Sequence, residues 1–188
     1  MSKTSIQDYR FCNKFGFPPR RAFGITEDAA IKNSLLSIDE IVIHHTDGEC
    51  TYEQLMKWML SGGDGREKLY KNAVAITNFY IDRIGDIYKI VPLTKWTYHS
   101  CSGKRDKTTV GVELIHKYGM FTDAQYQSLI DLIYELRIDC PNIKIISSHD
   151  YRYMKYSGMK KGCPSENFDW EKLKRMLYEN KFDFEVNI

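Results

Sequence analysis

Histidine and cysteine are residue types that bind transition metals, and the sequence holds five of each. Two of the histidines, His44 and His149, come at or just after apolar, β-branched runs that predict strands. In α/β proteins, strand ends and the loops beyond them are where functional side chains are presented. These two imidazoles are therefore the first candidates for chemistry.

Cys163 is the third candidate, and it follows the polar, lysine-rich segment that comes after His149. The next residue, Pro164, biases Cys163 toward an extended backbone. Two imidazoles and one thiolate that leave a fourth position open form a ligand set of catalytic zinc. Because His45 adjoins His44 and adjacent strand residues project to opposite faces, a metal on one face can take only one of them. Periodicity leaves open which one it takes.

The composition indicates a soluble globular protein, with 43% hydrophobic and 28% charged residues in 188. The net charge of +2 gives no indication of nucleic-acid binding, and no apolar run is long enough to span a bilayer. The N-terminal residues lack the pattern of a secretory signal, so we expect synthesis in the cytoplasm and no membrane partner. The cysteines form no C-x-x-C pair, and we expect no disulfide framework.

Apolar residues at strand or helix spacing, separated by turn signals, predict that strands and helices alternate along the chain. The predicted strands are residues 40–46, 75–82, 86–91, 109–115 and 144–148, of which the second and third form a hairpin. The predicted helices are residues 26–36, 51–60, 122–139 and 169–180. Capping boxes support two of them, Thr51-x-x-Gln54 and Thr122-x-x-Gln125.

These elements predict a single α/β domain in which helices flank one mixed central sheet of about five strands. We assign residues 1–37 to an N-terminal arm and short helix, residues 38–180 to the domain itself, and residues 181–188 to a C-terminal tail. The arm forms one globular unit with the domain, and we expect a monomer.

Seven segments carry a resemblance to a known family, and they occur in the order of that family. They are IVIHHT (41–46), NFYIDRIGDIYKIVP (78–92), YHS (98–100), TVGVELI (109–115), FTDAQYQSL (121–129), SHD (148–150) and KGCPSENFDW (161–170). From about residue 38 to about residue 177 the chain resembles the type-2 N-acetylmuramoyl-L-alanine amidases. That family includes amidase-type phage lysozymes, cytosolic anhydromuropeptide amidases and animal peptidoglycan recognition proteins.

The resemblance implies Zn²⁺ on His44, His149 and Cys163, and it selects His44 over His45. It implies that Glu113 and Lys161 are catalytic. The residue types suit these roles, because a carboxylate on a buried strand can serve as a general base. A lysine near the metal can stabilise the oxyanion that forms from the amide.

The same resemblance places four further residues at the substrate: His45, Thr46, Thr77 and His99. Thr77 stands where the phage lysozymes have a catalytic tyrosine, so that role does not transfer. The segment between His149 and Cys163 is also longer than in those relatives. We expect it to be a loop.

The function that the resemblance implies is zinc-dependent hydrolysis of the bond between N-acetylmuramic acid and L-alanine. The partner is then peptidoglycan or a muropeptide, and we favour a single-domain, phage-type endolysin. A cytosolic recycling amidase and a non-catalytic peptidoglycan-binding protein are the alternatives. A further alternative is a regulatory role in which residues 1–24 bind a partner. The sequence offers no positive evidence for it.

Overall fold

The computed structural model describes residues 6–8, 35–48, 50–51, 54–55, 77–91, 93, 97, 99–100, 102, 104–116, 118–160 and 162–188. Most of the predicted helices at residues 26–36 and 51–60 lies outside these ranges, and so does Lys161. The second helix nevertheless begins as predicted. The Thr51 backbone N–H donates to Gln54 Oε1 at 2.9 Å, and the Gln54 N–H donates to Thr51 Oγ1 at 3.2 Å.

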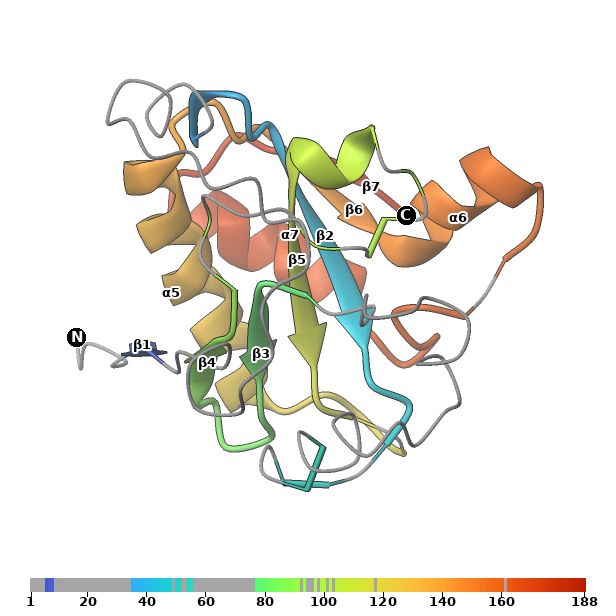
Figure 1. Ribbon diagram of the computed structural model, residues 1–188. Helices are drawn as coiled ribbons and strands as arrows, with labels where there is room; N and C mark the ends of the chain where they lie inside the picture. Colours follow the sequence, from blue (N-terminus) through green and yellow to red (C-terminus); the bar gives the residue numbers. More distant parts are fainter. Residues whose placement is uncertain are drawn as a thin grey trace.

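One mixed sheet forms the centre of the molecule (Figure 1). Its strands run in the order β1-β4-β3-β5-β2-β6-β7, and only the β3–β4 hairpin is antiparallel. The strands are β1 (Ile6–Asp8), β2 (Glu40–His45), β3 (Phe79–Ile81), β4 (Ile87–Lys89), β5 (Thr109–Leu114), β6 (Ile145–Ser148) and β7 (Glu185–Asn187). The predicted α/β class is confirmed.

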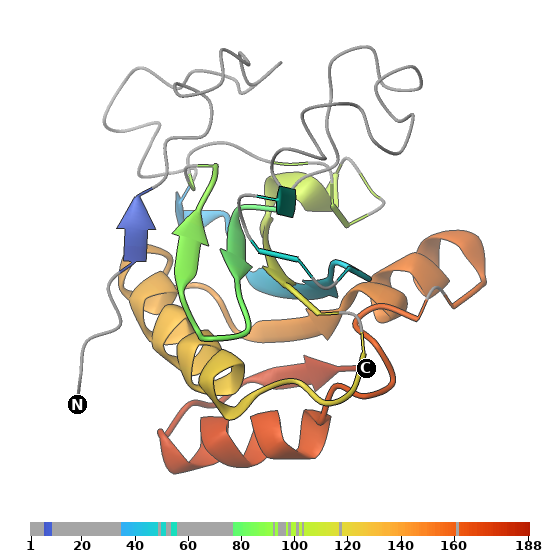
Figure 2. The ribbon, with the colours of Figure 1, turned by 90° about the horizontal axis from the view of Figure 1, so that it is seen from below.

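Three α-helices and one short 3₁₀ helix accompany the sheet in the described residues: α5 (Asp123–Asp139), α6 (His149–Ser157), α7 (Trp170–Glu179) and η1 (Arg105–Lys107). Figure 2 shows α5 and α7 together on one side of the sheet. The capping box predicted for α5 is present, with Thr122 accepting from the Gln125 N–H. Asp169 caps α7 by accepting from the Lys172 N–H at 2.8 Å.

The two faces of the sheet differ in chemistry. Alternate residues of β2 and β5, such as Ile41, Ile43, Val110 and Val112, pack in the main hydrophobic core with residues of α5 and α7. The residues between them project to the other face, because side chains alternate along a strand. That face carries polar groups, among them His44 and Glu113, which are partners in the β2–β5 register.

Three expectations require correction. The sheet has seven strands among the described residues, because two strands of only three residues, β1 and β7, extend its edges. β7 belongs to the segment predicted as a C-terminal tail, and it pairs with β6. The segment after His149 begins as helix α6 and not as a loop. Only His149 of α6 is buried, so the sequence shows no apolar periodicity there.

Within the described residues, none of the helices has the length and apolar character needed to cross a membrane.

Candidate metal centre

His44, His149 and Cys163 meet at one edge of the sheet. β2 and β6 are parallel neighbours in which Ile43 pairs with Ser148, so the residues that follow this pair are also adjacent. The imidazole centroids of His44 and His149 are 4.4 Å apart. One ligand atom from each of the three side chains lies within 4.8 Å of the others, and all three residues are buried.

This donor set fits Zn²⁺. In a tetrahedral zinc site with bonds of about 2.0–2.3 Å, ligand atoms are about 3.3–3.6 Å apart. Here His44 Nδ1 is 4.0 Å from Cys163 Sγ. Small side-chain adjustments would bring the three atoms onto one ion. The set also leaves a fourth tetrahedral position for another ligand, as in catalytic sites.

The N-terminus of α6 positions two of the three ligands. Ser148 caps the helix by accepting from the Tyr151 N–H at 2.9 Å, and this places His149 in the first turn. The Asp150 N–H donates to the Cys163 carbonyl at 2.6 Å, and the Asp150 carboxylate accepts from the Gly162 N–H at 3.0 Å. Asp150 thereby fixes the cysteine segment beside the histidine. This role was not predicted from the sequence.

His99 lies behind His44. Its Nδ1 is 3.1 Å from His44 Nε2, and its Nε2 is 3.1 Å from Thr109 Oγ1. The residue is buried, and this burial lowers the pKa of His99 to about 4, so the ring is neutral near pH 7. Because both ring nitrogens have protein partners, His99 is placed to support His44. The predicted contact with substrate finds no support in this arrangement.

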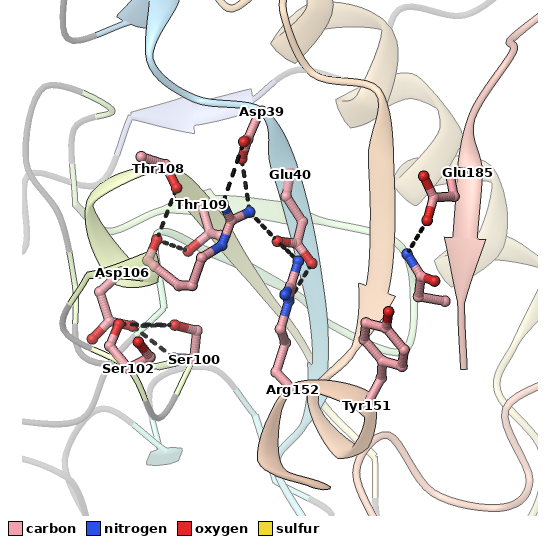
Figure 3. Close-up of polar contacts among 12 residues, drawn as sticks. Asp39, Glu40, Ser100, Ser102, Asp106, Thr108, Thr109, Tyr151, Arg152 and Glu185 are labelled. Atoms are coloured by element: carbon pink, nitrogen blue, oxygen red, sulfur yellow. Dashed lines mark hydrogen bonds and ion pairs between the residues drawn. The ribbon is translucent and has the colours of Figure 1, made fainter. Parts of the chain in front are cut away.

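A buried carboxylate fixes the backbone of His99. Asp106 accepts from the backbone N–H of His99 at 3.2 Å, and from the N–H and hydroxyl of Ser100 at 2.8 and 2.7 Å. Figure 3 shows the Ser100 contact. Burial raises the pKa of Asp106, while the hydrogen bonds from Ser100 and His99 act in the opposite direction. The segment that carries His99 is therefore held at its backbone as well as at its ring.

Glu40 is the second buried carboxylate, and its side chain has no exposed surface. It pairs with Arg105 of η1 and Arg152 of α6, and Arg105 also reaches Asp39 at 2.8 Å (Figure 3). A buried charge is tolerated when it is paired in this way. The cluster ties the start of the His44 strand to the helix that begins with His149. The sequence signal that could have revealed this cluster is a glutamate at the start of an apolar strand, because a buried carboxylate needs a cationic partner.

Glu113 and His45 lie on opposite faces of the sheet. Glu113 is half-buried and pairs with His44 in register, so the two side chains share a face of the sheet. His45 occupies the opposite face, 6.3 Å from His116 between ring centroids. Lys161 lies outside the described residues.

The two threonines have structural contacts. The buried Thr77 hydroxyl donates to the Phe79 carbonyl at 3.0 Å. The Thr46 hydroxyl donates to the Gly48 carbonyl at 2.9 Å and accepts from the His116 N–H at 3.1 Å. Their predicted contacts with substrate remain predictions, and these bonds do not support them. Thr77 is buried among the described residues.

The fold and the site together define a mixed α/β domain with a candidate metal centre of two histidines and one cysteine. The sequence model of the N-acetylmuramoyl-L-alanine amidase family matches residues 34–166. The chain belongs to this family. No curated protein sequence matches it.

Solved structures of low sequence identity share the fold. The endolysin N-acetylmuramoyl-L-alanine amidase LysCS from Clostridium intestinale is 21% identical, with a TM-score of 0.58 over 77% of this chain and 86% of that one. AmpD, solved as a selenomethionine derivative, is 19% identical, with a TM-score of 0.61 over 77% and 87%. Peptidoglycan recognition protein LE, in complex with tracheal cytotoxin, is 15% identical, with a TM-score of 0.57 over 78% and 83%.

Proposed function

We propose that this chain is a zinc-dependent N-acetylmuramoyl-L-alanine amidase, which hydrolyses the amide between the lactyl group of N-acetylmuramic acid and L-alanine. The observation that carries the proposal is the convergence of His44, His149 and Cys163, with Glu113 opposite His44 on the same face. Family membership makes this bond the expected target.

The roles follow from residue chemistry. Zinc, when bound, acts as a Lewis acid and lowers the pKa of a water ligand to about 7. Glu113 is the general base that takes a proton from the attacking water and returns it to the departing amine of L-alanine. We assign Lys161 the stabilisation of the oxyanion on the strength of its place in the sequence.

We further propose that the chain is a single-domain, phage-type endolysin acting on intact peptidoglycan. The chain shares its fold with the endolysin LysCS and, to a similar degree, with AmpD, so the choice is tested by a comparison of substrates. A cytosolic recycling amidase would prefer a soluble anhydromuropeptide. A non-catalytic binding protein would cut neither substrate. Retention of all three ligands together with Glu113 argues for catalysis.

The type of bond cut is the first test. Digestion of purified sacculi should release new L-alanine amino termini without new reducing sugar ends, because only one carboxylate, Glu113, is assigned to catalysis, whereas glycosidases need two that flank the acetal. A chelator should stop the release and zinc should restore it. Reducing ends that appear in step with activity, or full activity in chelator, would overturn the proposal.

Matched variants connect the activity to the metal. Cys163→Ser and His149→Ala should lose most of the bound zinc and the activity, whereas His45→Ala should keep its zinc because this histidine faces away. Zinc can be counted by elemental mass spectrometry. Comparing sacculi with purified anhydromuropeptide as substrates, with mass spectrometry of the products, then separates an endolysin from a recycling amidase.

A further inference from the structure

A continuous chain of hydrogen bonds leads from His44 into the protein. The Thr109 hydroxyl donates to the Arg105 carbonyl at 2.9 Å. A hydroxyl has a single proton, so Thr109 Oγ1 must accept from the nitrogen that it faces, His99 Nε2 at 3.1 Å. In the neutral imidazole of His99, a proton on Nε2 leaves Nδ1 as an acceptor.

The same reasoning determines the state of His44. Because His99 Nδ1 accepts, the nitrogen 3.1 Å away, His44 Nε2, must be the donor. The neutral His44 ring then has an unprotonated Nδ1, and this is the atom that lies 4.0 Å from Cys163 Sγ. The hydrogen-bond chain thus leaves a nitrogen lone pair free on the side of the His44 ring that lies near Cys163.

We propose that His99 and Thr109 are positioning residues that hold His44 in the tautomer and ring orientation required for metal binding. The inference rests on the metal site of the proposed function. Most metal-binding histidines donate their second N–H to a carboxylate, a carbonyl or water. In this protein the acceptor is the neutral ring of His99, and the hydrogen bond to Thr109 determines which of its two nitrogens accepts.

The packing leaves little freedom to this chain. A Cβ atom at Gly111 would lie 2.9 Å from both Cγ and Nδ1 of His99, so only glycine leaves room for the ring over β5. At the far end, the Arg105 side chain is held by Asp39 and Glu40, and Thr109 lies beside this cluster (Figure 3). The acceptor that orients Thr109 is therefore fixed.

Thr109→Val is the decisive variant, because the valine side chain has a similar shape but cannot accept from His99. A buried N–H without a partner is costly. We expect His99 to move its proton to Nδ1, where it donates to His44 Nε2. The proton of His44 must then sit on Nδ1, the metal-binding atom. Thr109→Ser keeps the hydroxyl and serves as the matched control.

Two measurements test the proposal. Nitrogen-15 NMR of the metal-free protein should show His44 protonated at Nε2 in wild type and Thr109→Ser, but at Nδ1 in Thr109→Val. Competition with a chromophoric chelator should show zinc affinity about 10–100-fold weaker in Thr109→Val, and close to wild type in Thr109→Ser. His99→Leu should be weakened similarly, whereas His99→Asn, which keeps an acceptor near Nδ1, should be weakened less.

Wild-type His44 protonated at Nδ1, or equal zinc affinity in wild type, Thr109→Val and His99→Leu, would overturn the proposal. If Thr109→Val does not fold, the comparison of His99→Asn with His99→Leu decides alone. These failures differ from failure of the proposed function, in which wild-type protein binds no zinc at micromolar concentration.

Discussion

Glu113 faces the candidate metal centre because of its position in β5. It pairs with His44 across the parallel β2–β5 ladder, and paired residues in such a ladder project to the same face. The neighbours Val112 and Leu114 project to the opposite face, into the main core. The strand therefore presents one carboxylate to the centre while its adjacent side chains stabilise the sheet.

Glu113→Gln tests the catalytic role of this carboxylate. The variant should keep its fold and its zinc, because glutamine has the same shape and Glu113 is not one of the three ligands. Its rate of amide hydrolysis should fall by about 100-fold or more, which is the scale of general-base removal. Steady-state rates on purified muropeptide, with zinc content measured in parallel, provide the check. A near-wild-type rate would move the role of base to another group.

Sequence reasoning named the three candidate ligands that the structure brings together, but not the residues that contact them. His44, His149 and Cys163 come from motifs that a family resemblance can match. The hydrogen bond from His44 to His99 joins residues 55 positions apart, and the Asp150 bond to Gly162 joins residues 12 apart. Such contacts depend on the packed geometry, and the types of the residues do not reveal them. His99 was accordingly expected at the substrate, and in the structure its ring contacts the candidate ligand His44.

At the level of elements, the N-terminus of α6 holds two of the candidate ligands beside each other. His149 opens the helix, and Asp150 binds the backbone of residues 162 and 163 through its own N–H and carboxylate. Gly162 has a φ of 71°, in the left-handed region, which allows the chain to turn into this contact. The conformation of a single glycine thus affects where the Cys163 thiol lies.

Gly162→Ala should therefore weaken metal binding. A Cβ atom in the left-handed region costs about 1–2 kcal/mol, and relaxation of the strain would displace Cys163. We expect zinc affinity to fall about 5–30-fold, measured by chelator competition. Gly158→Ala is the matched control, because Gly158 has a similar φ of 76° at the C-terminus of α6, four residues before Gly162. Equal losses of affinity in both variants would contradict the role of Gly162.

Elements with strong local signals were predicted well, and those without such signals were not. The capping box of Thr122 and Gln125 marks the start of α5, and a β-branched run marks β2. In α6 only His149 is buried, so its tyrosines and lysines form no apolar pattern at helical spacing. The three residues of β7 are too few to show alternation, and the strand is defined by its pairing with β6.

At the level of the whole molecule, the sheet separates a scaffold face from a functional face. α5 and α7 cover the former (Figure 2), while the polar clusters of Glu40, Asp106 and His99 lie with the functional segments. Glu40 of β2 connects η1 and α6 on the functional face through its ion pairs with Arg105 and Arg152. Its charge belongs to the architecture and has no assigned part in the reaction.

Glu40→Gln should destabilise the protein by about 3 kcal/mol or more, because it removes the buried counter-charge of Arg152 and leaves Arg105 with Asp39 alone. Asp39→Asn provides the control. Asp39 also binds Arg105, but its side chain is 43% exposed, so its loss should cost less than about 1 kcal/mol. Urea unfolding followed by circular dichroism measures both. Similar small losses in the two variants would mean that the cluster contributes little to stability.

The scaffold face should make the protein sensitive to alkaline pH. Burial raises the pKa of Tyr126, within α5, and the pKa of Cys140, at the C-terminal end of α5, each to about 12 from ordinary values of 10.0 and 9.0. Between about pH 9 and 12 the folded protein keeps two protons that the unfolded chain releases. The unfolded state then binds fewer protons, so the free energy of unfolding decreases as pH rises through this window.

Cys140→Ala and Tyr126→Phe should each reduce this dependence. Each titrating group contributes a slope of up to about 1.4 kcal/mol per pH unit, and removing the group removes its share. Both variants should be less stable than wild type at pH 7, since they lose buried packing or the hydrogen bond from the Asp169 N–H. Their stability should nevertheless decline less between pH 9 and pH 11 in urea titrations. Parallel pH profiles for wild type and both variants would show that these groups ionise equally easily in the folded and unfolded states.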